Sequence, residues 1–361
     1  MKKIFLLWLA LTLVLGLSLG ASTRPATAKT IELNLSHIMS AVSYPHIAFQ
    51  YYADKINERT KGRVKITVYA SGVLTSPAKV YESVEAGIND MGHHCAAYTP
   101  GPFPASEALF LPLPAANAWA FSRMASDYWS HFKLKELGKV RVMFGGTPGP
   151  YLITTIDKPV LKPEDLNGLK MRAIGPAVDL MKMWGGTPVS IPMGDVYEAL
   201  SKRVIDGGIL PLEAIAGFKF GDHLKYATIA PVGVSFPGFV VMNSKRWNGL
   251  PKDIQEVFTK TNEEMKEWYA RAWQYGDLQG VKYFTGLPGR KIMEISEADR
   301  ERFIKLADPL TEKYVADQTA KGIPAKEYVK YLWERGEYWN KQYPGDDEVI
   351  EWVEREIKKG K

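Results

Sequence analysis

The stretch DLNGLKMRAIGPAVDLMKMWGGTPVSIPMGDVYEALSKRVIDGG, residues 165–208, reads as short β-strands that alternate with short helices. Its hydrophobic spacing and its Gly and Pro residues predict strands at 165–175, 187–193 and 204–211 and helices at 176–186 and 194–203. Asp195 and Glu198 have the spacing of a capping box at the start of the second helix. Strands that alternate with helices indicate a parallel sheet with helical crossovers.

The same alternation occurs nearer the N-terminus. It predicts strands at 31–39, 63–71 and 88–98 and helices at 43–62 and 76–87. Val64, Ile66 and Val68 fall on one face of the second strand. Ser76 and Pro77 occupy the positions of an N-cap and of a first helical residue. The chain therefore contains two α/β units of similar order.

Long β-rich segments join the two units and lead out of the second one, at 140–156 and 226–244. Apolar residues then recur at steps of three and four over 250–276, which predicts a long amphipathic helix. Two further helices are predicted at 328–343 and 347–358. If the chain crosses twice between two lobes, the β-rich segments are the crossings and a cleft lies between the lobes.

The first 28 residues have the features of a cleaved signal peptide. Two lysines precede a mostly apolar, uncharged run, and Ala26-Thr27-Ala28 provides a small-x-small cleavage site. A membrane anchor is the alternative, because the run is close to the lower length limit for spanning a bilayer. Cleavage predicts a secreted chain in the bacterial periplasm, and the only cysteine, Cys95, cannot form an internal disulfide.

The charge of the chain gives no reason to expect a nucleic-acid partner. Removal of residues 1–28 leaves 43 basic and 40 acidic residues, a net charge of +3 against +6 for the whole chain. Binding to phosphates requires a concentrated basic surface. The 333 remaining residues exceed what one core usually holds, so at least two domains are expected.

Two α/β lobes, two crossings and a secretion signal together predict a two-lobed periplasmic-binding-protein fold of the α/β class. Each lobe is expected to be a mixed sheet flanked by helices, with the long helix spanning both. The predicted division is residues 29–150 for lobe 1, with part of the C-terminal region, 151–236 for lobe 2, and 237–361 for the return crossing and the C-terminal helices. Ligands of open α/β sheets bind outside the carboxyl ends of the strands.

Arg172 lies in an otherwise apolar, strand-like run. One interpretation is that Lys170 and Arg172, two residues apart, share a solvated strand face. The other is that Arg172 lies in the cleft and binds a carboxylate, because a guanidinium offers a fixed fork of donors that matches two carboxylate oxygens.

The chain resembles the extracytoplasmic solute-binding proteins of tripartite ATP-independent periplasmic (TRAP) transporters, of the dicarboxylate-binding-protein type. The resemblance is strongest over 165–208 and is supported by TKGRVKITVYASGVL at 60–74, YTPGPFPASEALFLP at 98–112 and MNSKRWNGLPKDIQ at 242–255. It implies that Arg172 forms a paired salt bridge with the ligand carboxylate. It also implies delivery of the ligand to a pair of TRAP membrane subunits, with no enzyme activity and no cofactor.

Two departures from the family pattern bear on the ligand. Many relatives have arginine where this chain has Pro102, and glycine where Lys202 and Arg203 stand. The loss of a possible second cation favours a monocarboxylate with an apolar or aromatic body over a dicarboxylate.

The resemblance and the positions of other residues give further candidates for the ligand site. Glu213 could contact a ligand hydroxyl, an amine or a bridging metal ion, or could instead cap the following helix. Tyr151, Phe236 and Phe239 lie on the crossings and could wall the pocket or pack in the core. His37 matches a loop that touches ligand in relatives. His93 and Cys95 share one strand face and His94 the other, so His93 could line the cleft, although no spacing typical of a zinc site follows.

The sequence thus predicts a periplasmic receptor that binds a small organic carboxylate. A receptor that presents its ligand to a sensor kinase is an alternative function. A secreted hydrolase is a third, but the chain has no Gly-x-Ser-x-Gly or His-Glu-x-x-His motif to support it.

Overall fold

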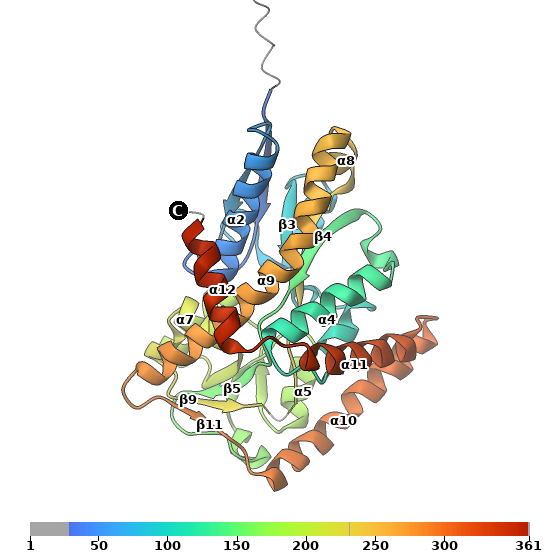
Figure 1. Ribbon diagram of the computed structural model, residues 1–361. Helices are drawn as coiled ribbons and strands as arrows, with labels where there is room; N and C mark the ends of the chain where they lie inside the picture. The colour runs from blue at the N-terminus through green and yellow to red at the C-terminus, as the bar shows by residue number, and fades with distance from the viewer. Residues whose placement is uncertain (1–28, 231, 360–361) are drawn as a thin grey trace, which may run out of the picture.

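The computed structural model describes residues 29–230 and 232–359 (Figure 1). The predicted signal segment, residues 1–28, lies outside the described residues. Two mixed β-sheets flanked by helices make up the described part, one with five strands and one with six. None of the helices described is both long enough and apolar enough to cross a membrane.

The five-stranded sheet has the strand order β2-β1-β3-β10-β4. Its strands are β1 (Ile31–Ser36), β2 (Val64–Tyr69), β3 (Met91–His94), β4 (Val140–Gly146) and β10 (Gly238–Asn243). β1 pairs in parallel with β2 and β3, whereas β10 lies antiparallel to β3 and β4. Val64 and Ile66 point into the core, as the alternation in β2 predicts.

The six-stranded sheet has the order β11-β9-β5-β8-β6-β7. Its strands are β5 (Leu152–Thr155), β6 (Lys170–Arg172), β7 (Thr187–Val189), β8 (Gly207–Leu210), β9 (Tyr226–Ile229) and β11 (Lys291–Met293). β6 pairs in parallel with β7 and β8, which is the crossover arrangement predicted for residues 165–208. β5 lies antiparallel to β8 and β9, and β11 was not predicted.

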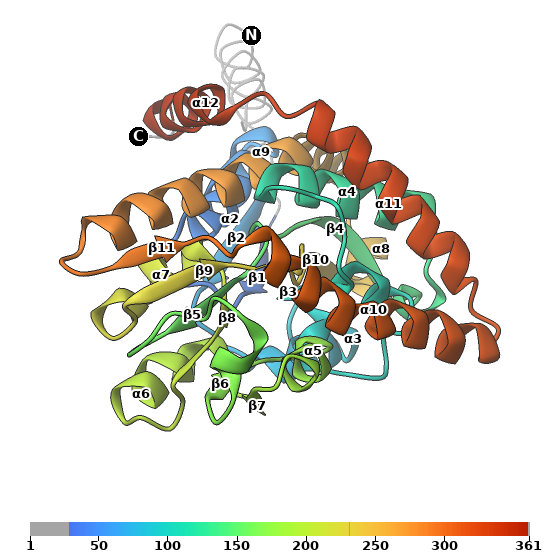
Figure 2. The same cartoon turned by 90° about the horizontal axis from the view of Figure 1, so that it is seen from below.

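Helices cover both sheets (Figure 2). They are α2 (Tyr44–Arg59), α3 (Val80–Glu85), α4 (Ala118–His131), α5 (Ala177–Met183), α6 (Val196–Ser201), α7 (Leu212–Gly217), α8 (Ser244–Asn248), α9 (Lys252–Gly286), α10 (Glu297–Ala320), α11 (Ala325–Lys341) and α12 (Asp346–Lys359). The sequence analysis did not predict α4, α8 or α10, and it foresaw α7 only as the helix that Glu213 could cap.

Ser76 and Asp195 occupy the predicted N-cap positions, and Pro77 directly follows Ser76. Neither Ser76 nor Asp195 accepts a capping hydrogen bond through its side chain. A short 3₁₀ turn precedes both α3 and α6, and its tighter backbone bonds satisfy the N–H groups that a cap would serve, for example the bond from Lys79 N to Ser76 O at 2.9 Å. Glu198 forms an ion pair with Lys202 instead of completing a capping box.

The chain passes from one sheet to the other between β4 and β5 and again between β9 and β10. A third passage runs through α9, which extends from beside the five-stranded sheet to the six-stranded one (Figure 1). Its apolar stripe is buried as predicted, with Ile254, Phe258 and Met265 at most 1% exposed, and the helix ends ten residues later than expected. The two-lobed fold with a long spanning helix is confirmed.

Candidate functional site

A small cavity lies between the two sheets and holds about 50 Å³. Both lobes, the second crossing and α9 contribute to its wall, which consists of Ile38, Met39, His93, Cys95, Tyr98, Gly146, Pro148, Tyr151, Ile174, Met193, Pro211, Glu213, Ala214, Phe218, Phe236, Gly238 and Trp273. Many of these residues directly follow β1, β3, β6 or β8 at the carboxyl end of the strand. The cavity is therefore where an open α/β fold places its ligand.

Arg172, the last residue of β6, is fully buried beside this cavity. Its Nε donates to the Ile191 carbonyl oxygen at 3.2 Å and its Nη2 donates to Tyr98 Oη at 3.2 Å. Its Nη1 is buried without a partner, and in the part of the chain that the structure describes no carboxylate pairs with Arg172. The interpretation of Arg172 as a solvated residue beside Lys170 is wrong, since only Lys170 is exposed.

The charge of Arg172 acts on the cavity wall. Burial raises the pKa of the Cys95 thiol to about 12, against a lowering influence from the Ala97 backbone and from Arg172. Burial likewise raises the pKa values of Tyr98 and Tyr151, and Arg172 lowers both in part. All three side chains line the cavity, so the guanidinium lies close enough to attract an anion within it.

Glu213 enters the cavity wall from the first turn of α7 and is 4% exposed. Burial raises the pKa of its carboxyl to about 8; the Asp277 charge adds to this, and a hydrogen bond with Ser43 opposes it. The alternative role as a helix cap is wrong, because Pro211 occupies the N-cap of α7 and no side chain caps that helix. Glu213 therefore faces the cavity as a buried acid.

Tyr151 and Phe236 also line the cavity, and their rings pack edge to face with centroids 5.0 Å apart. Phe239 does not line the cavity in this structure. Its ring packs in the core against Trp129 and His94. Gly238 lines the cavity instead, since successive residues of β10 face opposite sides of the sheet.

His37 is also absent from the cavity wall, although the next two residues, Ile38 and Met39, are part of it. Its ring is fully buried; Nε2 lies 2.9 Å from His46 Nδ1, and Nδ1 accepts from Met39 N at 3.2 Å. The ring turns into the core and packs against Phe49, so this structure does not support the predicted ligand contact of His37.

His93 and Cys95 face the cavity and His94 faces away, as strand alternation predicts. Neither ring nitrogen of His93 has a hydrogen-bond partner, and burial lowers its pKa to about 3, so the ring is neutral at pH 7. Among residues 29–230 and 232–359, no cluster of three or more His, Cys, Asp or Glu side chains is placed to hold a metal ion.

The sequence analysis missed several wall residues, above all Tyr98, Met193, Phe218 and Trp273. Tyr98 lies 74 positions before Arg172 and Trp273 belongs to α9, so no local spacing connects them with the site. The quoted stretch 98–112 contains Tyr98 and was the available signal.

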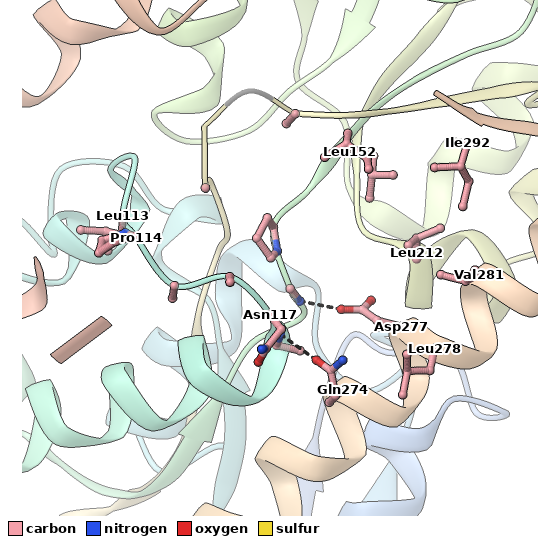
Figure 3. Close-up of a pocket in the computed structure, with 18 of the residues that line it drawn as sticks. Leu113, Pro114, Asn117, Leu152, Leu212, Gln274, Asp277, Leu278, Val281 and Ile292 are labelled. Atoms are coloured by element: carbon pink, nitrogen blue, oxygen red, sulfur yellow. Dashed lines mark hydrogen bonds between the residues drawn. The ribbon is translucent and has the colours of Figure 1, made fainter. Parts of the chain in front are cut away.

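A second and larger cavity, of about 520 Å³, lies at the hinge between the crossings and α9 (Figure 3). Apolar side chains such as Leu152, Leu212 and Ile292 form much of its wall. Two acceptors on α9 hold backbone N–H groups there: Asp277 Oδ2 accepts from Gly149 N at 2.7 Å and Gln274 Oε1 accepts from Ala118 N at 3.0 Å. None of the predicted ligand-binding residues lines this cavity, although chain neighbours of Tyr151 (Pro150 and Leu152) and of Glu213 (Leu212) do.

The chain matches the family described as "Bacterial extracellular solute-binding protein, family 7" over residues 35–318. The 2,3-diketo-L-gulonate-binding periplasmic protein YiaO of Escherichia coli (strain K12) is 26% identical over 297 residues, which cover 81% of this chain and 88% of that protein.

Two solved structures are also similar. A TRAP solute-binding protein from Rhodoferax ferrireducens T118, in complex with copurified benzoate, is 25% identical, with a TM-score of 0.81 and coverage of 86% of this chain and 99% of the other. A TRAP periplasmic solute-binding protein from Bordetella bronchiseptica, with bound (R)-mandelate and (S)-mandelate, is 26% identical, with a TM-score of 0.78 and coverage of 85% and 99%.

Proposed function

The chain belongs to the bacterial extracellular solute-binding proteins of family 7, of the type that serves TRAP transporters, and from this premise we propose that it captures an organic acid in the periplasm, holds the carboxylate on Arg172 and delivers the acid to a TRAP membrane permease. Members of this family are transport receptors and not enzymes. The hydrolase alternative is therefore excluded, and the ligand leaves chemically unchanged.

The buried guanidinium of Arg172 carries this proposal. A buried charge without a counter-charge is costly, and only an anion that enters the cleft can compensate it. The donor Nη1 is unused in the described structure, and Nη2 is already directed toward the wall residue Tyr98. A carboxylate offers two oxygens in one plane, so it can take both guanidinium donors with a modest displacement of the tyrosine hydroxyl.

The cavity favours a monocarboxylate with an apolar or aromatic body. Among the described residues its wall contains no lysine or arginine, so Arg172 beside it is the cation available there for one carboxylate. Tyr151, Phe236 and Trp273 offer ring surfaces for the rest of the molecule. The two relatives with bound benzoate and mandelate carry ligands of this type.

We propose further that residues 1–28 direct secretion and are removed, and that the two sheets mark two lobes at 29–150 and 151–236, with 237–361 bracing both. The permease pair would meet the closed, loaded receptor. Neighbouring genes for such a pair, as opposed to a lone sensor kinase, would support transport as the purpose of binding.

The test is thermal unfolding of the mature protein against a panel of carboxylates, with Arg172→Ala and Lys170→Ala compared. Lys170 lies on the same strand but is exposed, so it controls for loss of positive charge. Ligand at about a hundred times its Kd stabilises the protein by roughly 2.7 kcal/mol. We expect Arg172→Ala to weaken binding by about 30-fold or more, and Lys170→Ala to leave it unchanged. Equal affinity of the Arg172 variant and the wild type would refute the proposal.

A further inference from the structure

Glu213 is an acid in the cavity wall without a cationic partner. In the described part of the chain no lysine, arginine or histidine forms an ion pair with it. Its side chain lies close against α9: a Cβ placed on Gly276 would come within 2.8 Å of Glu213 Cγ. The Glu213 side chain is therefore held in position from behind.

Asp277, the residue after Gly276 on α9, fixes the backbone of Glu213. Its Oδ1 accepts from Glu213 N at 3.0 Å, while its Oδ2 accepts from Gly149 N at 2.7 Å on the first crossing (Figure 3). Asp277 is half-buried and also borders the larger hinge cavity. The two N–H donors favour the charged form of Asp277, which places a negative charge next to Glu213.

These surroundings favour a neutral Glu213. An ionised Glu213 would face Asp277 and the incoming ligand carboxylate, which makes three negative charges against the single positive charge of Arg172. Burial raises the pKa of Asp277 to about 6, with its two N–H donors opposing the rise, whereas the pKa of Glu213 rises to about 8. Asp277 therefore loses its proton at a lower pH than Glu213, which keeps its proton longer.

We propose that Glu213 presents a protonated carboxyl group to the cavity and donates a hydrogen bond to a hydroxyl or carbonyl oxygen on the body of the bound acid. Asp277 is the positioning residue that keeps Glu213 in place and neutral. The receptor then selects oxygen-bearing carboxylates over their unsubstituted analogues. It rejects amino acids, whose ammonium group meets a neutral acid instead of an anion. This inference rests on the proposed binding of a carboxylate at Arg172.

Other titratable groups near Glu213 do not change charge between pH 7 and 9.5. Burial lowers the pKa of His93 to about 3 and raises those of Tyr98, Tyr151, Tyr269 and Cys95, the last to about 12. Burial also lowers the pKa values of His37 and His46. Phenylacetate and mandelate do not titrate in this range either, so a change in their relative binding reports on Glu213.

The experiment is calorimetric titration at pH 7 and pH 9.5 with phenylacetate, mandelate, 3-hydroxyphenylacetate and phenylglycine, which share one aromatic skeleton. We expect wild type at pH 7 to bind one of the hydroxylated acids about tenfold more tightly than phenylacetate, the value of one buried hydrogen bond. The preference should disappear at pH 9.5. Glu213→Gln keeps a neutral donor, so its preference should persist at both pH values, whereas Glu213→Leu should show none.

Asp277→Asn separates positioning from a general structural role. Removal of the negative charge lowers the pKa of Glu213, so the preference for the hydroxylated acid should be lost at a lower pH than in wild type. A merely loosened fold would weaken all four acids and leave that pH unchanged.

Three results would overturn the inference: equal binding of phenylacetate and both hydroxylated acids by wild type, tighter binding of phenylglycine, or loss of the preference in Glu213→Gln at pH 7. Absence of binding by all four acids would instead overturn the aromatic cargo of the proposed function, and the inference with it.

Discussion

His94 shows how one residue can carry the pH dependence of stability. Its ring is fully buried among Tyr81, Phe103 and Phe239, and its Nδ1 has no partner. Burial, and to a lesser extent His93, lowers its pKa from 6.5 to about 3. Between pH 6.5 and 3 the His94 ring therefore binds a proton in the unfolded chain but not in the folded one. The contribution of the neutral ring to stability is present above pH 6.5 and is lost as the pH falls toward 3.

We predict that His94→Phe reduces the acid sensitivity of the fold. At pH 5 the unfolded histidine is protonated and the folded one is not, a difference of about 2 kcal/mol in the free energy of unfolding. Phenylalanine fits the aromatic surroundings and binds no proton. Thermal midpoints at pH 7.5 and pH 5 measure the effect, and any cost of altered shape cancels because it is the same at both. An equal drop in both proteins would show that His94 does not contribute.

At the scale of elements, α9 owes its contact with lobe 2 to a glycine. A Cβ on Gly280 would lie 2.3 Å from the carbonyl oxygen of Leu212, so only glycine lets α7 begin this close to α9. The same contact brings the backbone N–H of Glu213 within hydrogen-bond distance of the Asp277 carboxylate. The position of the Glu213 side chain in the cavity wall thus depends on the lack of a side chain at Gly280 of α9.

We predict that Gly280→Ala destabilises the protein by about 1–3 kcal/mol, because α7 must move away from the helix. Gly286→Ala is the matched control at the end of α9, where a new Cβ would meet nothing within 4 Å. Alanine is the better helix former by up to about 1 kcal/mol, so the control should be neutral or stabilising. Denaturant titration gives both values. A Gly280 variant as stable as the control would contradict the close approach seen here.

The elements that could be predicted from sequence are those with a regular pattern. The stripe Ile254-Phe258-Met265 identified α9, and the alternation Val64-Ile66 identified β2. α10 escaped prediction although Phe303, Ala307 and Leu310 form a buried stripe, because Pro309 interrupts the pattern and most of the other positions are polar. β6 and β7 are three residues long, so only their existence and order could be predicted.

At the scale of the whole molecule, the site consists of contacts between distant segments. Arg172 could be predicted because its residue type is out of place in its own strand. Tyr98 and Asp277 could not, because each gains its role from a partner more than 60 positions away. His37 was proposed from its likeness to a loop of the family and Phe239 from its position on a crossing, and neither argument says which side of its strand faces the cleft, because that depends on the packing of the two lobes.

The described structure has its lobes in contact across the cleft. A Cβ on Gly175 would lie 3.0 Å from the Cβ of Ala97, and one on Gly217 would lie 3.6 Å from the Cβ of Ser40. The cavity of about 50 Å³ is well below the ~300 Å³ of small ligand sites. An organic acid therefore cannot enter unless the lobes part, a hinge motion for which the two crossings and α9 are the connections.

A disulfide across the cleft tests this motion. The distance of 3.6 Å between the Cβ positions of Ser40 and Gly217 is within the range that a disulfide spans. We predict that the oxidised double variant Ser40→Cys, Gly217→Cys no longer binds the acid that wild type binds, and that reduction with dithiothreitol restores binding. The buried Cys95 is present in all variants, and the single variant Ser40→Cys is the control that should bind as wild type does. Thiol titration verifies that the disulfide has formed. If the oxidised protein still bound the acid at the wild-type rate, entry of the acid would not require α7 to separate from the loop that follows β1. The cavity would then have to enlarge by movement of its side chains alone.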